Sequence, residues 1–354
     1  MLTQTVAGRV YDYSHCIGQY VGGTTWSAEG FVQPIATAVG RDDVVYVLGR
    51  GSESTDAGPL LKPRAFGTRV GKFNIGDSHG DEEHLATFGS YGDDEGQFVW
   101  PAGMALDSQE NVYITDEWLN RVNVFDRDGR FLNQWGSPGK DEASFNRPSG
   151  IAIDGDDRLY IVDSLNHRVQ RFDRDGAFLG MWGGFGTGEG EFDSPWGVAV
   201  DGHGYVYVAD HKNHRVQKFS GEGDYVARFG RHGTGGGQLR HPSDVSVDID
   251  GDVYVFDWAN SRVQVFGPDA SFITSIVGDA QMLSKWAGMT VDANPDIQKA
   301  RRRVESLEPE WRFALPTGVT FDTWKSRLIV ADTQRYRLQI YNKEMDYTEP
   351  QFNL

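Results

Sequence analysis

Three side chains that can do acid–base or electrophilic chemistry stand at special positions in a repeating sequence. Arg50 follows a glycine at a place where five other segments carry an aspartate, and His211 directly follows one of these aspartates, Asp210. His241 precedes Pro242, which opens another segment. A guanidinium can bind a carboxylate or polarise a carbonyl oxygen, and an imidazole can transfer a proton near neutral pH. We therefore take Arg50, His211 and His241 as candidate catalytic residues.

The segments that position these residues form a repeat with a constant period. Pro101, Pro148, Pro195 and Pro242 are each 47 positions apart. A period in this range marks a ring or stack of small units, none of which can bury its own faces. An aspartate and an arginine recur five residues apart, as Asp116/Arg121, Asp163/Arg168, Asp210/Arg215, Asp257/Arg262 and Asp332/Arg337. Their recurrence favours a structural pair over a catalytic one.

Each repeat unit contains four short strand-like runs. In the unit that begins at Pro195, these runs are residues 198–201, 205–209, 215–219 and 225–229, and turns rich in glycine separate several of them. Runs of β-branched and aromatic residues are typical of strands that are covered on both faces. Four antiparallel strands per unit, joined by glycine-rich links, predict an all-β fold, a β-propeller with one blade per unit.

Two incomplete units are expected to close the ring. A degenerate unit begins at Pro34, lacks the aspartate and resumes its third strand at Arg69. The unit that begins at Pro316 has only three strands, whereas residues 8–18 end like the fourth strands of other units. We expect this N-terminal strand to complete the last blade, which leaves no open sheet edge. The predicted fold is one six-bladed β-propeller domain over residues 1–354.

Two insertions interrupt the period, at about residues 50–68 and 279–315. One follows a second strand and the other follows a fourth strand, so both are expected to emerge on the same face of the ring. Asn294 and Pro295 can start a helix in the longer insertion, and apolar residues then recur on one stripe. We expect a helical insertion on one face that covers the channel mouth as a flap. In the alternative interpretation, the insertions brace the seam of the ring.

Six further residues are candidate ligand-binding residues because of their place in the repeat. Glu117 and Trp258 occupy the position directly after the repeated aspartate, as Arg50 and His211 do. Varied residues at such a position are typical of a tailored pocket, and equally of an ordinary variable loop. Tryptophans on this face can wall an apolar pocket or form the core beneath the flap. The candidates are Glu117, Trp118, Ser149, Trp196, Trp258 and Thr317.

The composition limits the classes of partner and compartment. The chain has 51 Asp+Glu against 34 Lys+Arg, a net charge of −17, which disfavours binding to a nucleic-acid backbone. Its single cysteine, Cys16, excludes an intrachain disulfide and suits a reducing compartment. We see neither a signal peptide nor an apolar run of the roughly 20 residues that span a bilayer. An acidic cytoplasmic protein that binds a small molecule, or alternatively a peptide or protein, is expected.

Segments 195–201, 206–210 and 213–217 resemble NHL repeats, the modules of six-bladed propellers, and the resemblance covers nearly the whole chain. Among NHL proteins, the chain also resembles the peptidyl-α-hydroxyglycine amidating lyases, which have Arg-Gly at the end of the second strand of the first blade. Arg50 and Gly51 stand at that place here.

The zinc site of these lyases has no counterpart in the sequence. In the lyases, histidines after the blade-opening prolines hold a zinc ion. The matching positions here are Ile35, Ala102, Ser149, Trp196, Ser243 and Thr317. None of these is a histidine, and a catalytic zinc normally needs three protein ligands. The resemblance therefore does not extend to the zinc site, and it leaves any metal or cofactor open.

Two classes of function follow from these patterns. The first is an enzyme of lyase or hydrolase type that acts on a small molecule at the channel mouth, under the helical flap. Arg50 would be the electrophilic clamp of this enzyme, with His211 or His241 as acid and base. The alternative is a non-catalytic NHL propeller that binds a peptide or protein partner. A covered mouth favours the enzyme, because a broad docking face gains nothing from a flap.

Overall fold

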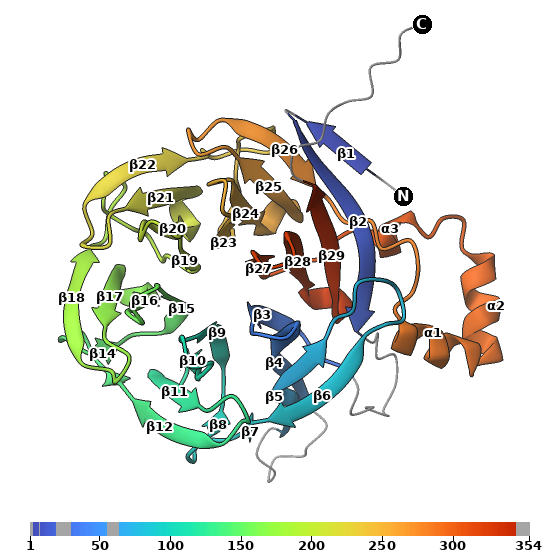
Figure 1. The fold of residues 1–354 in the computed structure, drawn as a ribbon, viewed down its shortest axis with the longest axis horizontal. Coiled ribbons are helices and arrows are strands. Elements are labelled where there is room, and N and C mark those ends of the chain that lie inside the picture. The colour runs from blue at the N-terminus through green and yellow to red at the C-terminus, as the bar shows by residue number, and fades with distance from the viewer. Residues whose placement is uncertain (1–2, 7, 19–29, 55–63, 345–354) are drawn as a thin grey trace, which may run out of the picture.

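The computed structural model describes residues 3–6, 8–18, 30–54 and 64–344. Figure 1 shows small antiparallel sheets arranged as a ring, viewed down the axis of the ring. Five of these sheets have four strands, and the sheet that combines both ends of the chain has five. The fold is therefore a six-bladed β-propeller, which confirms the prediction from the repeat.

The first three blades follow one another along the chain, each from the channel outward. Blade 1 consists of β3 (Pro34–Val39), β4 (Val44–Ser54), β5 (Arg64–Asn74) and β6 (Glu83–Phe88). Blade 2 consists of β9 (Pro101–Leu106), β10 (Val112–Asp116), β11 (Arg121–Phe125) and β12 (Phe131–Trp135). Blade 3 consists of β15 (Pro148–Ile153), β16 (Leu159–Asp163), β17 (Arg168–Phe172) and β18 (Phe178–Gly183).

The remaining blades repeat this order, apart from the last. Blade 4 consists of β19 (Val198–Val200), β20 (Val206–Asp210), β21 (Arg215–Phe219) and β22 (Tyr225–Phe229). Blade 5 consists of β23 (Pro242–Val247), β24 (Val253–Asp257), β25 (Arg262–Phe266) and β26 (Phe272–Ile276). Blade 6 consists of β27 (Gly318–Asp322), β28 (Arg327–Asp332), β29 (Arg337–Glu344), β2 (Arg9–Gly18) and β1 (Thr3–Val6).

Short elements connect the strands. Two-residue parallel pairs lie in two of the links between blades, as β7 (Ser90–Tyr91) with β8 (Gln97–Phe98) and β13 (Ser137–Pro138) with β14 (Ser144–Phe145). Four single turns of 3-10 helix join second to third strands, as η1 (Ser164–Asn166), η2 (His211–Asn213), η3 (Trp258–Asn260) and η4 (Thr333–Arg335). These turns hold the position after the repeated aspartate on one face of the ring.

The core lies between neighbouring blades, because successive side chains of a strand point to opposite faces of its sheet. In β20, Val206 and Val208 pack in one cluster with Tyr160 of blade 3. Tyr207, between them in sequence, packs in the next cluster with Val255 of blade 5. All five residues of β20 are buried. The continuous apolar run that identifies each second strand is therefore a consequence of burial on both faces.

The ring closes within blade 6, which combines strands from both ends of the chain. β2 pairs antiparallel with β29, and Ile17 lies opposite Leu338. β1 then pairs with the outer edge of β2. Arg9 Nε and Nη2 donate hydrogen bonds to the carboxylate of Asp252 at 2.5 and 2.7 Å, which ties this strand to blade 5.

The shorter insertion extends blade 1. β4 and β5 continue past the point where the other blades turn, so that Arg50 lies opposite Thr68 and Ser54 lies opposite Arg64. Residues 55–63, the middle of the insertion expected at 50–68, lie outside the described residues. Arg50 is therefore held inside a paired strand and not at the tip of a loop.

The longer insertion contains three helices. They are α1 (Lys285–Asp292), α2 (Pro295–Arg303) and α3 (Glu308–Trp311). The side chain of Asn294 caps α2 by accepting hydrogen bonds from the N–H groups of Asp296 and Ile297. No helix in the described part of the chain is long and apolar enough to cross a membrane.

These helices do not cover the channel mouth, so the expected flap is wrong. Figure 1 shows them outside the ring, beyond β2. The insertion follows β26, the outermost strand of blade 5, and therefore starts at the perimeter of the ring. Trp286 of α1 is buried there, with its ring centroid 5.9 Å from that of Phe73. Arg337 Nη2 also donates to the carbonyl oxygen of Glu310, which holds α3 against blade 6.

Candidate functional site

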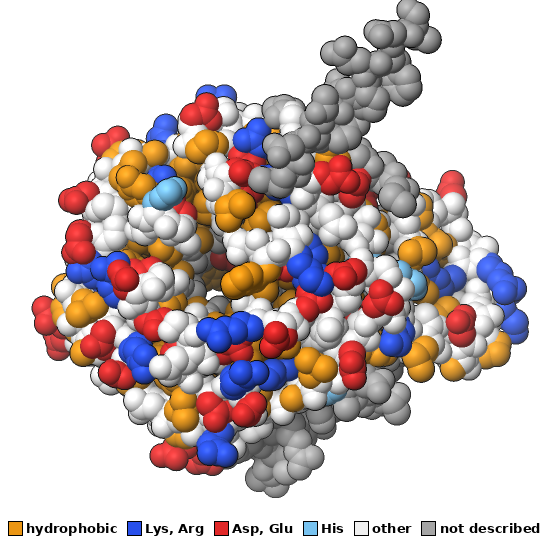
Figure 2. All heavy atoms as spheres, viewed as in Figure 1, with side chains coloured by type: hydrophobic (Ala, Val, Ile, Leu, Met, Phe, Trp, Pro, Cys, Tyr) orange, Lys and Arg blue, Asp and Glu red, His pale blue; other side chains and the backbone are white. Residues whose placement is uncertain are grey.

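A cavity of about 200 Å³ lies on the axis of the ring. Residues of the segments that open all six blades line it, and Figure 2 shows a hollow at the centre of the ring. The side chains of three lining residues are ionisable, namely Arg50, Glu117 and Asp244. A concave site with a few convergent polar groups is the usual form of a small-molecule site. This cavity is therefore the candidate functional site.

Arg50 reaches the cavity because of a local departure from the repeat. Gly49 replaces the aspartate, and a Cβ atom at Gly49 would lie 3.0 Å from the carbonyl oxygens of Val32 and Gly67. The Arg50 guanidinium donates from Nε to the carbonyl oxygen of Pro101 at 3.2 Å and lies over the ring of Trp100. Burial lowers the pKa of Arg50 from its ordinary value, although the side chain remains a cation.

Glu117, directly after β10, is a carboxylate partner of Arg50. Its Oε2 lies 3.5 Å from Nη2 of Arg50, and its Oε1 lies 3.4 Å from Nη1 of Arg147. Among the described side chains, the acidic partner of Arg50 is thus a residue of the next blade. The carboxylate is shared by two arginines, of which Arg50 lines the cavity and Arg147 does not.

His211 and His241 lie behind Trp196 and not on the cavity wall. The ring centroid of His211 is 4.3 Å from that of Trp196 and 4.9 Å from that of His241. Burial lowers the pKa of His211 to about 4, which keeps its imidazole neutral at neutral pH. Nδ1 of this ring lies 3.1 Å from the carbonyl oxygen of Pro242. The structure therefore places the two candidate bases on the blade 4–5 side of the ring, across the axis from Arg50.

The remaining predicted residues divide into two groups. Ser149, Trp196 and Thr317 line the cavity together with Arg50 and Glu117. Trp118 and Trp258 do not line it, and 60% of Trp118 is exposed. The repeat locates a residue on one face of the ring but does not give its distance from the axis.

The hydroxyl groups on the cavity wall are engaged in contacts between blades. Ser149 Oγ donates to the carbonyl oxygen of Trp196 at 2.8 Å, and Thr317 Oγ1 donates to that of Ile35 at 3.3 Å. These bonds join the position after the opening proline in one blade to the same position in the next. Such hydroxyls can still accept a hydrogen bond from a ligand.

Asp244 is the cavity residue that the sequence interpretation missed. It stands two residues after an opening proline, where the other blades carry glycine or alanine, namely Ala36, Gly103, Gly150, Gly197 and Gly318. A Cβ atom at Gly150 would lie 2.6 Å from the carbonyl oxygen of Trp196, which shows how closely the blades approach here. Comparison of this position along the repeat, as was done for Arg50, would have identified it.

The Asp244 carboxylate has backbone partners. Its Oδ2 accepts a hydrogen bond from the N–H of Val319 in blade 6 at 2.9 Å. Burial raises the pKa of Asp244 to about 7, because the anion is poorly solvated there. A carboxyl group with this pKa can both give and take a proton near neutral pH.

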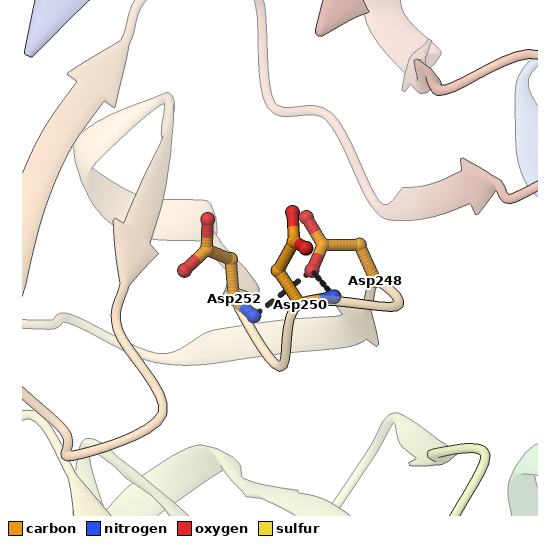
Figure 3. Close-up of side chains that lie close together, drawn as sticks. All are labelled: Asp248, Asp250 and Asp252. Carbon is orange, nitrogen blue, oxygen red and sulfur yellow. Dashed lines mark hydrogen bonds between the residues drawn. The ribbon is translucent and has the colours of Figure 1, made fainter. Parts of the chain in front are cut away.

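A second acidic group lies on the turn between β23 and β24, away from the cavity. Asp248, Asp250 and Asp252 point to the same side of this turn (Figure 3). Among the described residues, they form the one group of three potential ligands close enough to share a metal ion. Lys343 Nζ already lies 2.8 Å from Asp250 Oδ2 and 3.0 Å from Asp252 Oδ2. The ammonium group therefore occupies the place of a cation, and this cluster fastens β29 to blade 5.

Three stretches of the chain match the family model of the NHL repeat, at residues 145–172, 192–219 and 239–266. They cover the first three strands of blades 3, 4 and 5, so the chain contains NHL repeats in a six-bladed propeller.

Two curated proteins share short matches with the chain. One is the protein brain tumor of Drosophila melanogaster, which is 41% identical over 44 residues. The other is the B-box type zinc finger protein ncl-1 of Caenorhabditis elegans, which is 43% identical over 44 residues. Each match covers 12% of this chain, and 4% and 5% of the respective relatives.

Solved structures with similar folds cover nearly the whole chain. A protein of unknown function from Bacteroides thetaiotaomicron has a TM-score of 0.59 and 16% identity, over 95% of this chain and 76% of that one. A gluconolactonase from Xanthomonas campestris has a TM-score of 0.56 and 14% identity, over 95% and 89%. A streptogramin B lyase has a TM-score of 0.53 and 12% identity, over 93% and 98%. At such identities, the likeness concerns the fold.

Proposed function

We propose that the chain is an enzyme of lyase or hydrolase type that acts on a small molecule in the central cavity. The observation that carries this proposal is the convergence of Arg50 and Asp244 on one cavity, each at a position where the other blades have no such side chain. Propellers of similar fold include a lyase and a gluconolactonase, which supports an enzyme without naming its substrate.

Arg50 is proposed as the electrophilic group. In elimination from a carbon next to a carbonyl, a base removes a proton and the bond to the leaving oxygen breaks. In hydrolysis of an ester or lactone, water adds to the carbonyl carbon and the bond to the alcohol oxygen breaks. Both reactions build negative charge on the carbonyl oxygen. The guanidinium of Arg50 can stabilise that charge with its remaining N–H donors.

Asp244 is proposed as the acid–base group. Both reactions need one proton removed, from carbon or from water, and one proton delivered to the departing oxygen. Asp244 can carry out this exchange because both of its protonation states are populated near neutral pH. His211, which is neutral and packed against Trp196, is assigned the role of holding that ring against the cavity.

The test is turnover of a panel of small lactones, esters and β-substituted carbonyl compounds. Arg50→Lys and Asp244→Asn should each lower kcat by about 100-fold or more, and neither variant should melt at a lower temperature than the wild type. Arg147→Lys is the matched control, since Arg147 shares Glu117 with Arg50 but does not line the cavity. Equal loss in all three variants, or turnover that survives in Asp244→Asn, would contradict the assignment.

Binding of a peptide or protein partner is the second candidate function. The observation that favours it is the exposure of Trp118, which directly follows the cavity residue Glu117. Exposed tryptophans are frequent anchors in protein interfaces. Trp118→Ala should then weaken the binding of such a partner by about 2 kcal/mol or more, as measured by calorimetry. Turnover of the panel should be unchanged in the same variant.

A further inference from the structure

We infer that the central cavity takes a small organic anion, held at Arg50, and that this anion binds together with one proton, held by Asp244. The inference rests on the proposed function, because it names the ligand class of the same cavity, a carboxylate of the kind that hydrolysis of an ester or lactone releases. The inference depends on three features, which are the charges around Arg50, the surroundings of Asp244 and the size of the cavity.

The charge balance at Arg50 favours an anion. Glu117 is contacted by both Arg50 and Arg147, so its single negative charge is divided between two cations and does not fully neutralise Arg50. Within the described residues, Nη1 of Arg50 has neither a hydrogen bond nor an ion pair. A guanidinium edge that has a free donor suits a carboxylate of the ligand.

The surroundings of Asp244 provide no counter-charge. Its hydrogen bond from Val319 is a backbone bond, and no side-chain cation among the described residues bonds to it. The titratable and charged groups on the elements beside β23 are His241, Asp210, Tyr207, His211, Lys212, Arg215, Lys218, Asp257, Tyr254 and Asp322. Asp210, Asp257 and Asp322 are bonded to Arg215, Arg262 and Arg327 of their own blades.

The two histidines add no positive charge at neutral pH. Burial is the main cause that lowers the pKa of His211 to about 4, and burial also lowers the pKa of His241. Lys212 lies 3.7 Å from Asp193 and is exposed. An ionised Asp244 would therefore face an anionic ligand without compensation, and the pair would repel each other.

This repulsion couples anion binding to a proton. Below the pKa of Asp244, about 7, the carboxyl is neutral and can donate a hydrogen bond to the ligand. Above that pKa, the free protein must take up a proton from solvent before the anion can bind. Affinity should then fall by about tenfold for each pH unit above 7, and should be flat below it.

The size of the cavity sets an upper limit on the ligand. A volume of about 200 Å³ is smaller than the pockets of roughly 300–1,000 Å³ that enclose drug-sized ligands. The ligand class is therefore a small carboxylate, with its charged end at Arg50 and a hydroxyl or carbonyl oxygen toward Asp244.

The experiment is calorimetry with matched pairs of probes. Lactate, gluconate and benzoate are titrated beside lactamide, gluconamide and benzamide, in two buffers that differ in ionisation enthalpy. The carboxylates should bind and the amides should bind at least tenfold more weakly. Near pH 8.5, each bound carboxylate should take up about one proton, whereas near pH 5.5 it should take up none.

Three variants separate the contributions. Asp244→Asn should bind carboxylates without proton uptake and, near pH 9, about 100-fold more tightly than the wild type. Glu117→Gln should bind them more tightly at every pH but keep the proton uptake. Arg50→Gln should lose at least tenfold in affinity for carboxylates and little for amides.

The outcomes distinguish this inference from the proposed function. Amides that bind as tightly as carboxylates, or proton uptake that persists in Asp244→Asn, overturn the inference while the cavity remains the site. If no probe binds and no compound of the lactone and ester panel is turned over, both the inference and the proposed function fail.

Discussion

Arg215 Nε donates a hydrogen bond to Asp210 Oδ2 at 2.8 Å, and both side chains are buried at the junction of β20 and β21. The same bond recurs in blades 3, 5 and 6. In blade 2 no direct hydrogen bond joins the described side chains of Asp116 and Arg121. There Asp116 accepts bonds from the N–H groups of Val99, Trp100, Trp118 and Leu119. The repeated spacing is thus constant, whereas the bond depends on the blade.

The first prediction concerns the buried pairs. Asp210→Ala and Asp163→Ala should each lower the free energy of unfolding by about 3–5 kcal/mol, because each leaves a buried arginine without its carboxylate. Urea denaturation followed by circular dichroism measures the loss. The two losses should agree within error, and a large effect on ligand binding from one variant alone would show that its pair is functional.

The second prediction concerns a missing bond in blade 2. Gln217 bonds through Nε2 to the carbonyl oxygen of Glu191 and through Oε1 to the N–H of Gly190. Asn123 occupies the same repeat position but is one methylene shorter, and neither atom of its buried amide has a partner among the described residues. Asn123→Gln should therefore raise the free energy of unfolding by about 1–2 kcal/mol.

Gln217→Asn is the reverse experiment in blade 4. It should lower stability by about as much as Asn123→Gln raises it. If Asn123→Gln destabilises the protein in the same urea titration, then the amide of Asn123 is satisfied by bound water.

The third prediction concerns stability against pH. The pKa of Asp244 is raised by burial from 3.8 to about 7 on folding. Between these values the folded protein holds one more proton than the unfolded chain, so stability from this group is present at low pH and is lost as pH rises toward 7. At about pH 8, the ionised Asp244 lowers the free energy of unfolding by at most about 4 kcal/mol.

Asp244→Asn removes this penalty and keeps an acceptor for the Val319 N–H. The variant should be more stable than the wild type at about pH 8, with a difference that shrinks toward pH 4, as measured by urea denaturation. Asp175→Asn, at an exposed turn, is the control and should show no such trend. A difference that is independent of pH would show that Asp244 does not titrate in this range.

The fourth prediction concerns Lys343. Burial alone would lower its pKa, but hydrogen bonds to Asp248 and Asp250 outweigh burial and raise it, so the ammonium stays charged. Lys343→Met leaves three carboxylates without this cation and should cost about 3–5 kcal/mol. Calcium chloride should recover part of the melting temperature in the variant only, because the three carboxylates can then share a calcium ion. Calcium that stabilises the wild type equally would contradict this account.

The fold could be predicted from the sequence because the repeat encodes it several times. The opening prolines, the buried second strand and the aspartate recur at one period, and each occurrence has the same local cause. Residues 8–18 were assigned to the last blade because its unit has only three strands. They form β2, which pairs with β29 as the fourth strand of that blade.

The site could be predicted only in part. A departure from the repeat made Arg50 a candidate, whereas Asp244, which departs from the repeat in the same way, was not among the candidates. His211 and His241 share the face of Arg50 and yet lie behind Trp196, since the repeat does not give the distance from the axis. The helices lie at the perimeter of the ring and not over its mouth, because Trp286 packs there in one buried cluster with Phe73. This contact depends on tertiary structure.

The pairing of β2 with β29 also determines when blade 6 can fold during synthesis of the chain. Gly18 and Arg337, which lie opposite each other, are separated by 319 positions. At a synthesis rate of about 5–20 residues per second, β2 leaves the ribosome about 15–60 s before its partner exists. During that interval, the growing chain is an open arc with an unpaired strand at one end, and such edges invite association with other chains. Closure of blade 6 is then the last step and the one that commits the whole ring to its folded form.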